Sequence, residues 1–156
     1  MRPLSRVPIS TDVGDVSTDV RRLFEELARQ RPERRDQVAG ECLPLLDVFE
    51  TRDAFDLLLD VPGVAASNLR ILVKSGVVII AGEKDRPDQS ARGHASFHLV
   101  ERDFGRFARA VRVHAAVDAA KATATLKDGE LRVRLPKIDE RRGQGIVIPV
   151  TSDAAP

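Results

Sequence analysis

Between Leu43 and Lys137, apolar residues recur at every second position in short runs that turn-forming residues separate. The run from Phe55 to Val61 is the cleanest, and it ends at Pro62-Gly63. Successive side chains of a β-strand point to opposite faces of the sheet, so this period predicts strands with one buried face. No stretch of this region has the pattern of a long helix. We therefore expect an all-β domain.

The order of the runs indicates how the strands are connected. Residues 122–126 and 131–135 alternate on either side of Asp128-Gly129, which is typical of a hairpin turn. The continuous apolar run Val77–Ala81 predicts a strand that is buried on both faces and covered by a second sheet. Seven or eight short strands connected in this way favour a two-sheet β-sandwich over a barrel.

A different period precedes the strands. Residues 15–31 carry apolar side chains at helical spacing, with Asp15 and Ser17 as possible caps and Pro32 as a stop. The charged stretch Arg29–Asp36 favours a mobile arm whose apolar stripe contacts other proteins. The alternative is a helix docked on its own domain. The stripe consists of Val16, Val20, Leu23, Phe24 and Leu27.

Composition excludes several classes of partner. The 156 residues include 25 Lys and Arg against 24 Asp and Glu, a balance that gives no field to attract nucleic acid. No run approaches the roughly 20 apolar residues of a membrane span, and the first thirty residues do not resemble a signal peptide. The single cysteine, Cys42, fits a reducing compartment. We expect a cytoplasmic protein that neither binds nucleic acid nor spans a membrane.

The sequence offers no convincing catalytic or metal-ligating group. His94 and His98 are four residues apart in an expected loop, where this spacing does not create a metal site. Carboxylates such as Asp56 and Asp60 alternate with apolar residues and fit the solvent face of a strand. No glycine-rich run has the spacing of a phosphate-binding loop. We expect no enzyme activity, no catalytic residue, no metal and no cofactor.

Several blocks of the chain resemble one family. ATLKDGEL at positions 124–131, followed by RVRLPK, resembles the hallmark of the α-crystallin domain. The blocks DVFETRDAFDLLLDVPGV, VVIIAGEK and LVERDFGRFARAVRV are similar to the bacterial and plant branch of the small heat-shock proteins. The sequence departs from the family pattern at His114, where Pro is usual, and at Glu130, where an apolar residue is usual.

The resemblance implies an immunoglobulin-like β-sandwich that dimerises and assembles through its terminal arms. It divides the chain into a partly disordered N-terminal arm with an amphipathic helix (1–42), an α-crystallin domain (43–137) and a C-terminal extension (138–156). It also implies an ATP-independent chaperone, a holdase that binds unfolding proteins and prevents their aggregation. The expected partners are other copies of the chain and unfolding client proteins.

Arg109 is the residue that the strand pattern leaves unexplained. It shares a strand face with Phe107 and Val111, and an unpaired guanidinium on an apolar face is costly. The resemblance places Arg109 at the dimer interface with Glu101 as its partner, and implies that the loop from Glu83 to Phe97 crosses to the neighbouring subunit. The alternatives are an Arg109 that reaches solvent at a sheet edge and an ordinary mobile loop.

The C-terminal Gly145-Ile146-Val147-Ile148-Pro149 follows a polar spacer and has no neighbouring strand to pair with. Ile146 and Ile148 share one face of such a strand, so they can fill a groove on another dimer as an oligomerisation plug. The alternative is a strand that folds back on its own domain. The expected plug-accepting groove consists of Leu69, Ile71, Val73, Ala122, Ala124 and Leu126.

Two other functions remain open at this stage. An adaptor with the same sandwich fold would stay monomeric and bind one defined partner, without need of the crossing loop, Arg109 or the two isoleucines. A hydrolase or metal enzyme would need a convergent polar pocket with perturbed titrating groups. The oligomeric state and the response of an aggregating client protein distinguish the three.

Overall fold

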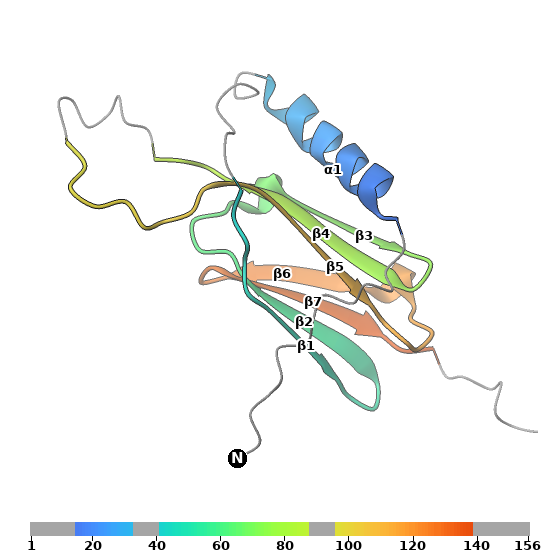
Figure 1. The fold of residues 1–156 in the computed structure, drawn as a ribbon. Helices are drawn as coiled ribbons and strands as arrows, with labels where there is room; N and C mark the ends of the chain where they lie inside the picture. Colours follow the sequence, from blue (N-terminus) through green and yellow to red (C-terminus); the bar gives the residue numbers. More distant parts are fainter. Residues whose placement is uncertain (1–14, 33–40, 88–95, 139–156) are drawn as a thin grey trace, which may run out of the picture.

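A computed structural model describes residues 15–32, 41–87 and 96–138. In these residues two antiparallel sheets face each other, with strand orders β1-β2-β7-β6 and β3-β4-β5, and a helix lies on the outside of the second (Figure 1). This confirms the two-sheet sandwich and the short N-terminal helix. The elements are α1 (Ser17–Gln30), β1 (Leu46–Glu50), β2 (Ala54–Asp60), β3 (Leu69–Lys74), β4 (Val77–Lys84), β5 (Gly105–Arg112), β6 (Thr123–Lys127) and β7 (Glu130–Pro136).

The core lies between the two sheets. Most of the strand residues buried there come from alternate positions of β2, β4 and β7, as period two requires. The β6–β7 hairpin turns at Asp128 and Gly129, which both have positive φ, 52° and 82°. Pairing of Leu126 with Leu131 next to this turn brings the expected apolar faces into register. The centre of the core is formed by Leu57, Leu59, Val78, Ile80, Val133 and Leu135.

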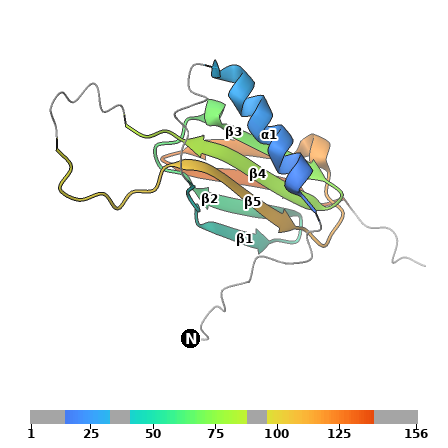
Figure 2. The same ribbon diagram turned by 45° about the horizontal axis from the view of Figure 1, so that its top comes forward.

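Strand β4 is buried on both faces, as its continuous apolar run predicts. Val78 and Ile80 belong to the core between the sheets, whereas Val77, Ile79 and Ala81 belong to a second cluster on the outer face. The cover on that outer face is helix α1, whereas the sequence analysis expected a second sheet alone (Figure 2). A single amphipathic helix provides enough apolar surface to cover the middle strand of a three-stranded sheet.

Helix α1 begins and ends close to the expected positions. Asp15 Oδ1 accepts a hydrogen bond from the backbone N–H of Ser17 at 2.9 Å. The side chain of Ser17 and, to a smaller extent, this backbone bond lower the pKa of the Asp15 carboxyl. Leu23 and Leu27 are buried, Leu23 in the cluster on the outer face of the sheet, and the other members of the stripe are partly buried. The docked helix is thus the arrangement that the structure has, and the freely tethered arm favoured by the charged linker is not.

Residues 96–104 extend away from the sandwich beyond the N-terminal end of β5, and we call them the protruding segment (Figure 1). They are not assigned to a strand, although a small strand is expected there from Phe97 to Val100. Phe97, Leu99 and Val100 are 55%, 75% and 66% exposed. These apolar side chains find no cover within the described chain. Among the described helices, none is long and apolar enough to cross a membrane.

Gly82 allows a close contact at the end of the core. A Cβ built at this position would lie 2.3 Å from Cζ of Phe107 and 2.9 Å from Cδ2 of Leu69. Phe107 is the cross-strand partner of Gly82, and its ring lies over the space that a side chain would occupy. The glycine is therefore required by packing.

We expect Gly82→Ala to lower the free energy of unfolding by about 1–3 kcal/mol, because the Phe107 ring must move out of a packed core. Urea denaturation at fixed protein concentration measures the change. Thr125→Ala, on an exposed position of β6, is the control and should stay within about 0.5 kcal/mol of the wild type. Equal midpoints for the two variants would contradict the packing role of Gly82.

Candidate functional site

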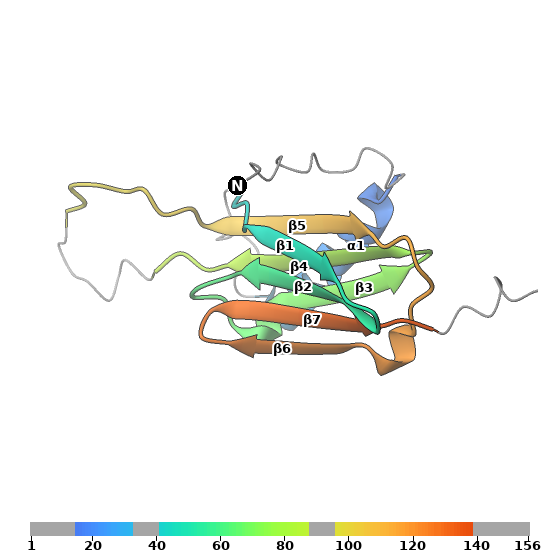
Figure 3. The same ribbon diagram turned by 90° about the horizontal axis from the view of Figure 1, so that it is seen from below.

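The two long sides of the sandwich differ in how they end. Strands β1 and β5 are the last strands of their sheets on one side, and β3 and β6 are the last strands on the other (Figure 3). An edge strand presents unpaired backbone N–H and C=O groups and is a template for another strand. Both sides of the sandwich are therefore candidate binding surfaces.

Arg109 connects the two sheets on the β1 and β5 side. Its guanidinium Nη1 donates a hydrogen bond to the Pro44 carbonyl oxygen at 2.8 Å, in the segment that leads into β1. The same segment bonds to β5 through the Cys42 N–H and the Arg106 carbonyl oxygen at 3.2 Å. The arginine on the apolar face of β5 thus has a partner, and its charge reaches the rim of the core.

The expected partner of Arg109 is not the one that the structure provides within the chain. Glu101 is exposed on the protruding segment, and no ion pair joins it to Arg109 in the described residues. Pairing of Arg109 with Glu101 of another subunit is a separate prediction and stays one.

Exposed apolar side chains lie on this same side of the sandwich. Leu43 and Leu45 are 65% and 73% exposed beside β1, and Phe97 lies on the protruding segment.

On the opposite side, the predicted groove residues occupy two edge strands that belong to different sheets and a position just before β6. Leu69 is buried, and Ile71, Val73, Ala122 and Leu126 are partly buried against the core. Ala124 is exposed. Apolar side chains at the open border of the core are therefore in place on both strands. The proposed occupants, Ile146 and Ile148, lie outside the described residues.

The stripe of α1 faces the β3-β4-β5 sheet. Asp19 pairs with Lys74 of β3 at 2.9 Å, and the centre of the Phe24 ring lies 5.3 Å from Cζ of Arg106 in β5. Sequence reasoning assigned these apolar residues to contacts with other proteins. In the structure the chain's own sheet occupies them, and whether they bind clients stays a prediction.

The sequence analysis missed two ion pairs whose carboxylates are buried. Asp56, expected on the solvent face, is only 3% exposed and pairs with Arg134 at 2.8 Å across β2 and β7. Glu83 is also buried and pairs with Arg106 at 2.9 Å across β4 and β5. In each case the two residues are direct cross-strand partners, which can be recognised only once the strand register is known. Both pairs connect neighbouring strands, so we assign them a structural role.

In the part of the chain that the structure describes, no three side chains of His, Cys, Asp or Glu come together as a metal site would require. His98 lies on the exposed protruding segment, and His94 lies outside the described residues. Cys42 is partly buried, with its thiol 3.7 Å from the Gly105 carbonyl oxygen. The described surfaces offer apolar edges and strand templates, which suit binding of protein segments.

Comparisons with known proteins agree with this geometry. The sequence profile described as the Hsp20/alpha crystallin family matches residues 47–151. Heat shock protein 16 of Schizosaccharomyces pombe is 32% identical over 120 residues, which cover 76% of this chain and 82% of that protein. The 17.7 kDa class II heat shock protein of Arabidopsis thaliana is 30% identical over 117 residues, 72% of this chain and 74% of the plant protein.

The fold agrees as well. The solved structure of heat shock protein 16.0 from Schizosaccharomyces pombe superimposes with a TM-score of 0.61 at 27% identity, covering 70% of this chain and 100% of that one. A two-sheet sandwich with apolar edges, a family match over most of the chain and relatives of this identity define the class. The chain belongs to the Hsp20/alpha crystallin family, the small heat-shock proteins.

Cys42 provides a test of the packing between β5 and the segment before β1. Burial raises the pKa of the Cys42 thiol, with a smaller opposing effect of Lys84 and a further increase from Asp103. A raised pKa means that the folded chain keeps its proton to higher pH than the unfolded chain does. The thiol contribution to stability is therefore complete below the ordinary thiol pKa and is lost as the pH rises above it.

We expect iodoacetamide to alkylate Cys42 more slowly in the native chain than in urea at pH 8, because less thiolate is present and access is restricted. The pH profile of the native rate should be displaced to higher pH. Mass spectrometry follows the reaction, and Cys42→Ser is the blank. Identical profiles for native and unfolded chain would show that this segment is not packed on β5.

Proposed function

We propose that the protein is an ATP-independent holdase that assembles from dimers, binds unfolding proteins in the cytoplasm and keeps them from aggregating. Membership of the small heat-shock protein family supports the chaperone role. The observation that carries the proposal is the set of exposed apolar side chains beside unpaired strand edges in an otherwise well-packed domain. Such surfaces suit association with other chains.

Dimerisation is proposed through the protruding segment. Its Phe97, Leu99 and Val100 are exposed, and β1 has a free edge on the same side of the sandwich. A segment from one subunit that pairs with β1 of the other would satisfy both edges and cover Leu45. In such a dimer Arg109, at the rim of this side, lies near enough to the interface for the proposed pairing with Glu101 of the partner subunit.

Higher assembly is proposed through the C-terminal plug. Insertion of Ile146 and Ile148 between β3 and β6 of another dimer would bury two side chains, worth roughly 3–6 kcal/mol before any cost. Ordering the strand and its tether costs about 1–2 kcal/mol per residue and offsets much of this gain. Each plug is therefore weak, and many in one particle give avidity while still allowing exchange.

Client capture follows from that exchange. Heat weakens the contacts of plugs and arms, so that groove residues and the stripe of α1 become accessible to apolar segments of unfolding proteins. The client then occupies a surface that the assembly normally covers. No nucleotide is needed, because binding competes with subunit contacts and release follows from client refolding or transfer.

The central test is aggregation of heated citrate synthase with and without the purified protein, in the absence of ATP, followed by light scattering. We expect scattering to be suppressed in proportion to the amount of protein added, by particles well above monomer mass. Bovine serum albumin at equal mass is the control. A monomeric protein that leaves the aggregation unchanged would overturn the proposal in favour of an adaptor.

The plug is tested by Ile146→Ala combined with Ile148→Ala. We expect the particle to shrink toward dimers, because each plug loses most of its buried apolar area, while the domain stays folded. Light scattering after size exclusion measures the mass. Val147→Ala, on the opposite face of the same short strand, should leave the mass unchanged. Particles of wild-type size in the double variant would remove the plug from the assembly.

The dimer interface is tested by Leu99→Asp. A carboxylate at this apolar position would be buried without a partner in the exchanged strand, so we expect monomers and a loss of larger particles. Ser96→Asp adds the same charge a few residues earlier and should leave dimers intact. If sedimentation shows dimers for both variants, the protruding segment does not form the interface.

A further inference from the structure

The outer face of the β3-β4-β5 sheet holds a helix in a defined orientation. Leu23 is buried there in one cluster with Val77, Ile79 and Ala81, and Leu27 is buried one turn further along the helix. Neighbouring positions on the sheet carry small side chains, among them Ala108 and Ala110 of β5. Small residues allow a helix to approach the sheet closely, and α1 lies over this face of the sheet (Figure 2). This face of the sheet is therefore suited to bind one amphipathic helix.

Polar contacts fix the first turn of this helix. Both carboxylate oxygens of Asp19 lie 2.9 Å from Nζ of Lys74, at the end of β3. Lys74 and Leu72 lie on the outer face of β3, with Leu72 packed in the same apolar cluster as Leu23. Lys74 therefore favours a helix with an acidic residue at the position of Asp19, four positions before Leu23.

Polar contacts also fix the other end. Arg31, directly after α1, pairs with Asp85 at 2.9 Å and donates from Nη1 to Oδ1 of Asn68, also at 2.9 Å. Asn68 is only 3% exposed and donates from Nδ2 to Asp85 at 3.2 Å and to the Glu83 carbonyl oxygen. Asn68 thus holds the Asp85 carboxylate in position to pair with a basic residue that directly follows the helix.

The four residues with these contacts or buried positions are evenly spaced in the sequence. Asp19, Leu23 and Leu27 follow one another at intervals of four within α1, and residues four apart lie on one face of an α-helix. Arg31 comes four positions later, just after the helix ends at Gln30. The face therefore selects a pattern: an acidic residue, two apolar residues and a basic residue at this interval. Many helices of unrelated sequence satisfy it.

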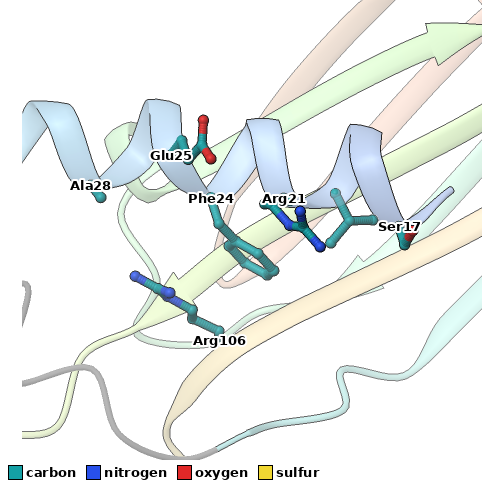
Figure 4. Close-up of a pocket in the computed structure, with 7 residues that line it drawn as sticks. Ser17, Arg21, Phe24, Glu25, Ala28 and Arg106 are labelled. Atoms are coloured by element: carbon teal, nitrogen blue, oxygen red, sulfur yellow. The ribbon is translucent and has the colours of Figure 1, made fainter.

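Helix α1 does not fill the face. A pocket remains on its β5 side, where Phe24 projects from the helix toward Arg106 of β5 (Figure 4). Phe24 is only partly buried in this position, although it contacts the Arg106 guanidinium. The pocket is lined by Ser17, Val20, Arg21, Phe24, Glu25, Ala28 and Arg106. Apolar surface next to the occupant gives a competing helix a place to make first contact.

We propose that the outer face of the β3-β4-β5 sheet is a binding site for amphipathic helices of unfolding proteins, and that α1 occupies it as an internal competitor. Partly unfolded proteins keep much of their helical structure while exposing its apolar side, which is the chemistry that this face accepts. The biological role rests on the proposed holdase function, but the binding site itself can be tested independently.

Competition by α1 sets the affinity that an external helix experiences. A tethered occupant acts at a high effective concentration, so only the small fraction of chains with an undocked α1 can bind another helix. The apparent dissociation constant rises in inverse proportion to that fraction. Conditions that loosen α1, such as heating, therefore open the site at the time when client helices appear.

The test uses a fluorescein-labelled peptide of residues 15–32 and the full chain with Leu23→Ser and Leu27→Ser, which removes the internal competitor and leaves the face intact. We expect saturable binding by fluorescence anisotropy, at least about tenfold tighter than to the wild-type chain. A peptide carrying the same two serines should not bind. If the labelled peptide binds both chains equally or neither, the proposal is overturned.

A second variant guards against misfolding of the first. Asp19→Lys with Arg31→Glu releases the two ends of α1 through partly exposed side chains, and it should also bind the peptide more tightly than wild type does.

Adding Ala110→Arg to either variant places a long charged side chain on the outer face of the β3-β4-β5 sheet and should abolish peptide binding. The matched substitution Thr125→Arg, on an exposed position of the other sheet, should leave peptide binding unchanged. Binding that survives Ala110→Arg would refute the assignment.

Orientation is tested by exchanging charges between peptide and chain. A peptide with Asp19→Lys should bind about three- to fivefold more weakly to the serine variant at low salt, as expected for an exposed ion pair. Lys74→Glu in the chain should restore its binding. Failure of these peptide experiments leaves the aggregation assay unaffected, so loss of this site and loss of the holdase function are distinguishable.

Discussion

The burial of β4 on both faces is the constraint on which the rest of the structure depends. Val78 and Ile80 point into the core between the sheets, and Val77 and Ile79 point away from it. A strand with this sequence cannot be left open to water on either side, since each exposed face would present several large apolar residues. The chain meets this demand by packing a second sheet on one face and a helix on the other. The position of α1 therefore follows from the composition of β4.

The borders of the sandwich follow a different logic. A two-sheet fold of seven strands leaves four edge strands, and each must be paired, covered or made unattractive. The chain partly covers the β1 and β5 side through Cys42 and Arg109, but leaves apolar residues such as Leu99 exposed near it. On the other side, β3 and β6 keep apolar side chains at the open border of the core. Proteins that remain monomeric commonly place charged side chains on their edge strands. The apolar side chains at the edges of this sandwich therefore favour association with other chains.

Much of this architecture could be predicted from the sequence, because period two and turn residues are local signals. The strands, the hairpin at Asp128 and the helix have such signals, and the family resemblance supplied the sheet arrangement. Three features could not be predicted, since each depends on contacts between distant segments. The burial of Asp56 requires the β2–β7 register, the bond from Arg109 to Pro44 requires the path of the segment before β1, and docking of α1 requires the shape of the sheet. The charged linker after α1 suggested a free arm because the sequence alone does not show that the outer face of the sheet can bind the helix.

Strand β3 connects the two binding surfaces proposed for this protein. Its inner residues Ile71 and Val73 border the core where the plug is expected, and its outer residues Leu72 and Lys74 hold α1. Because β3 is an edge strand, β4 is its only hydrogen-bonded neighbour in the described sheet, and a shift of β3 that improves one surface alters the other. Binding free energies coupled in this way are reciprocal: if release of α1 weakens the plug, then loss of the plug must loosen α1 by the same factor. Subunit exchange and exposure of the helix site would then be two consequences of one displacement of β3.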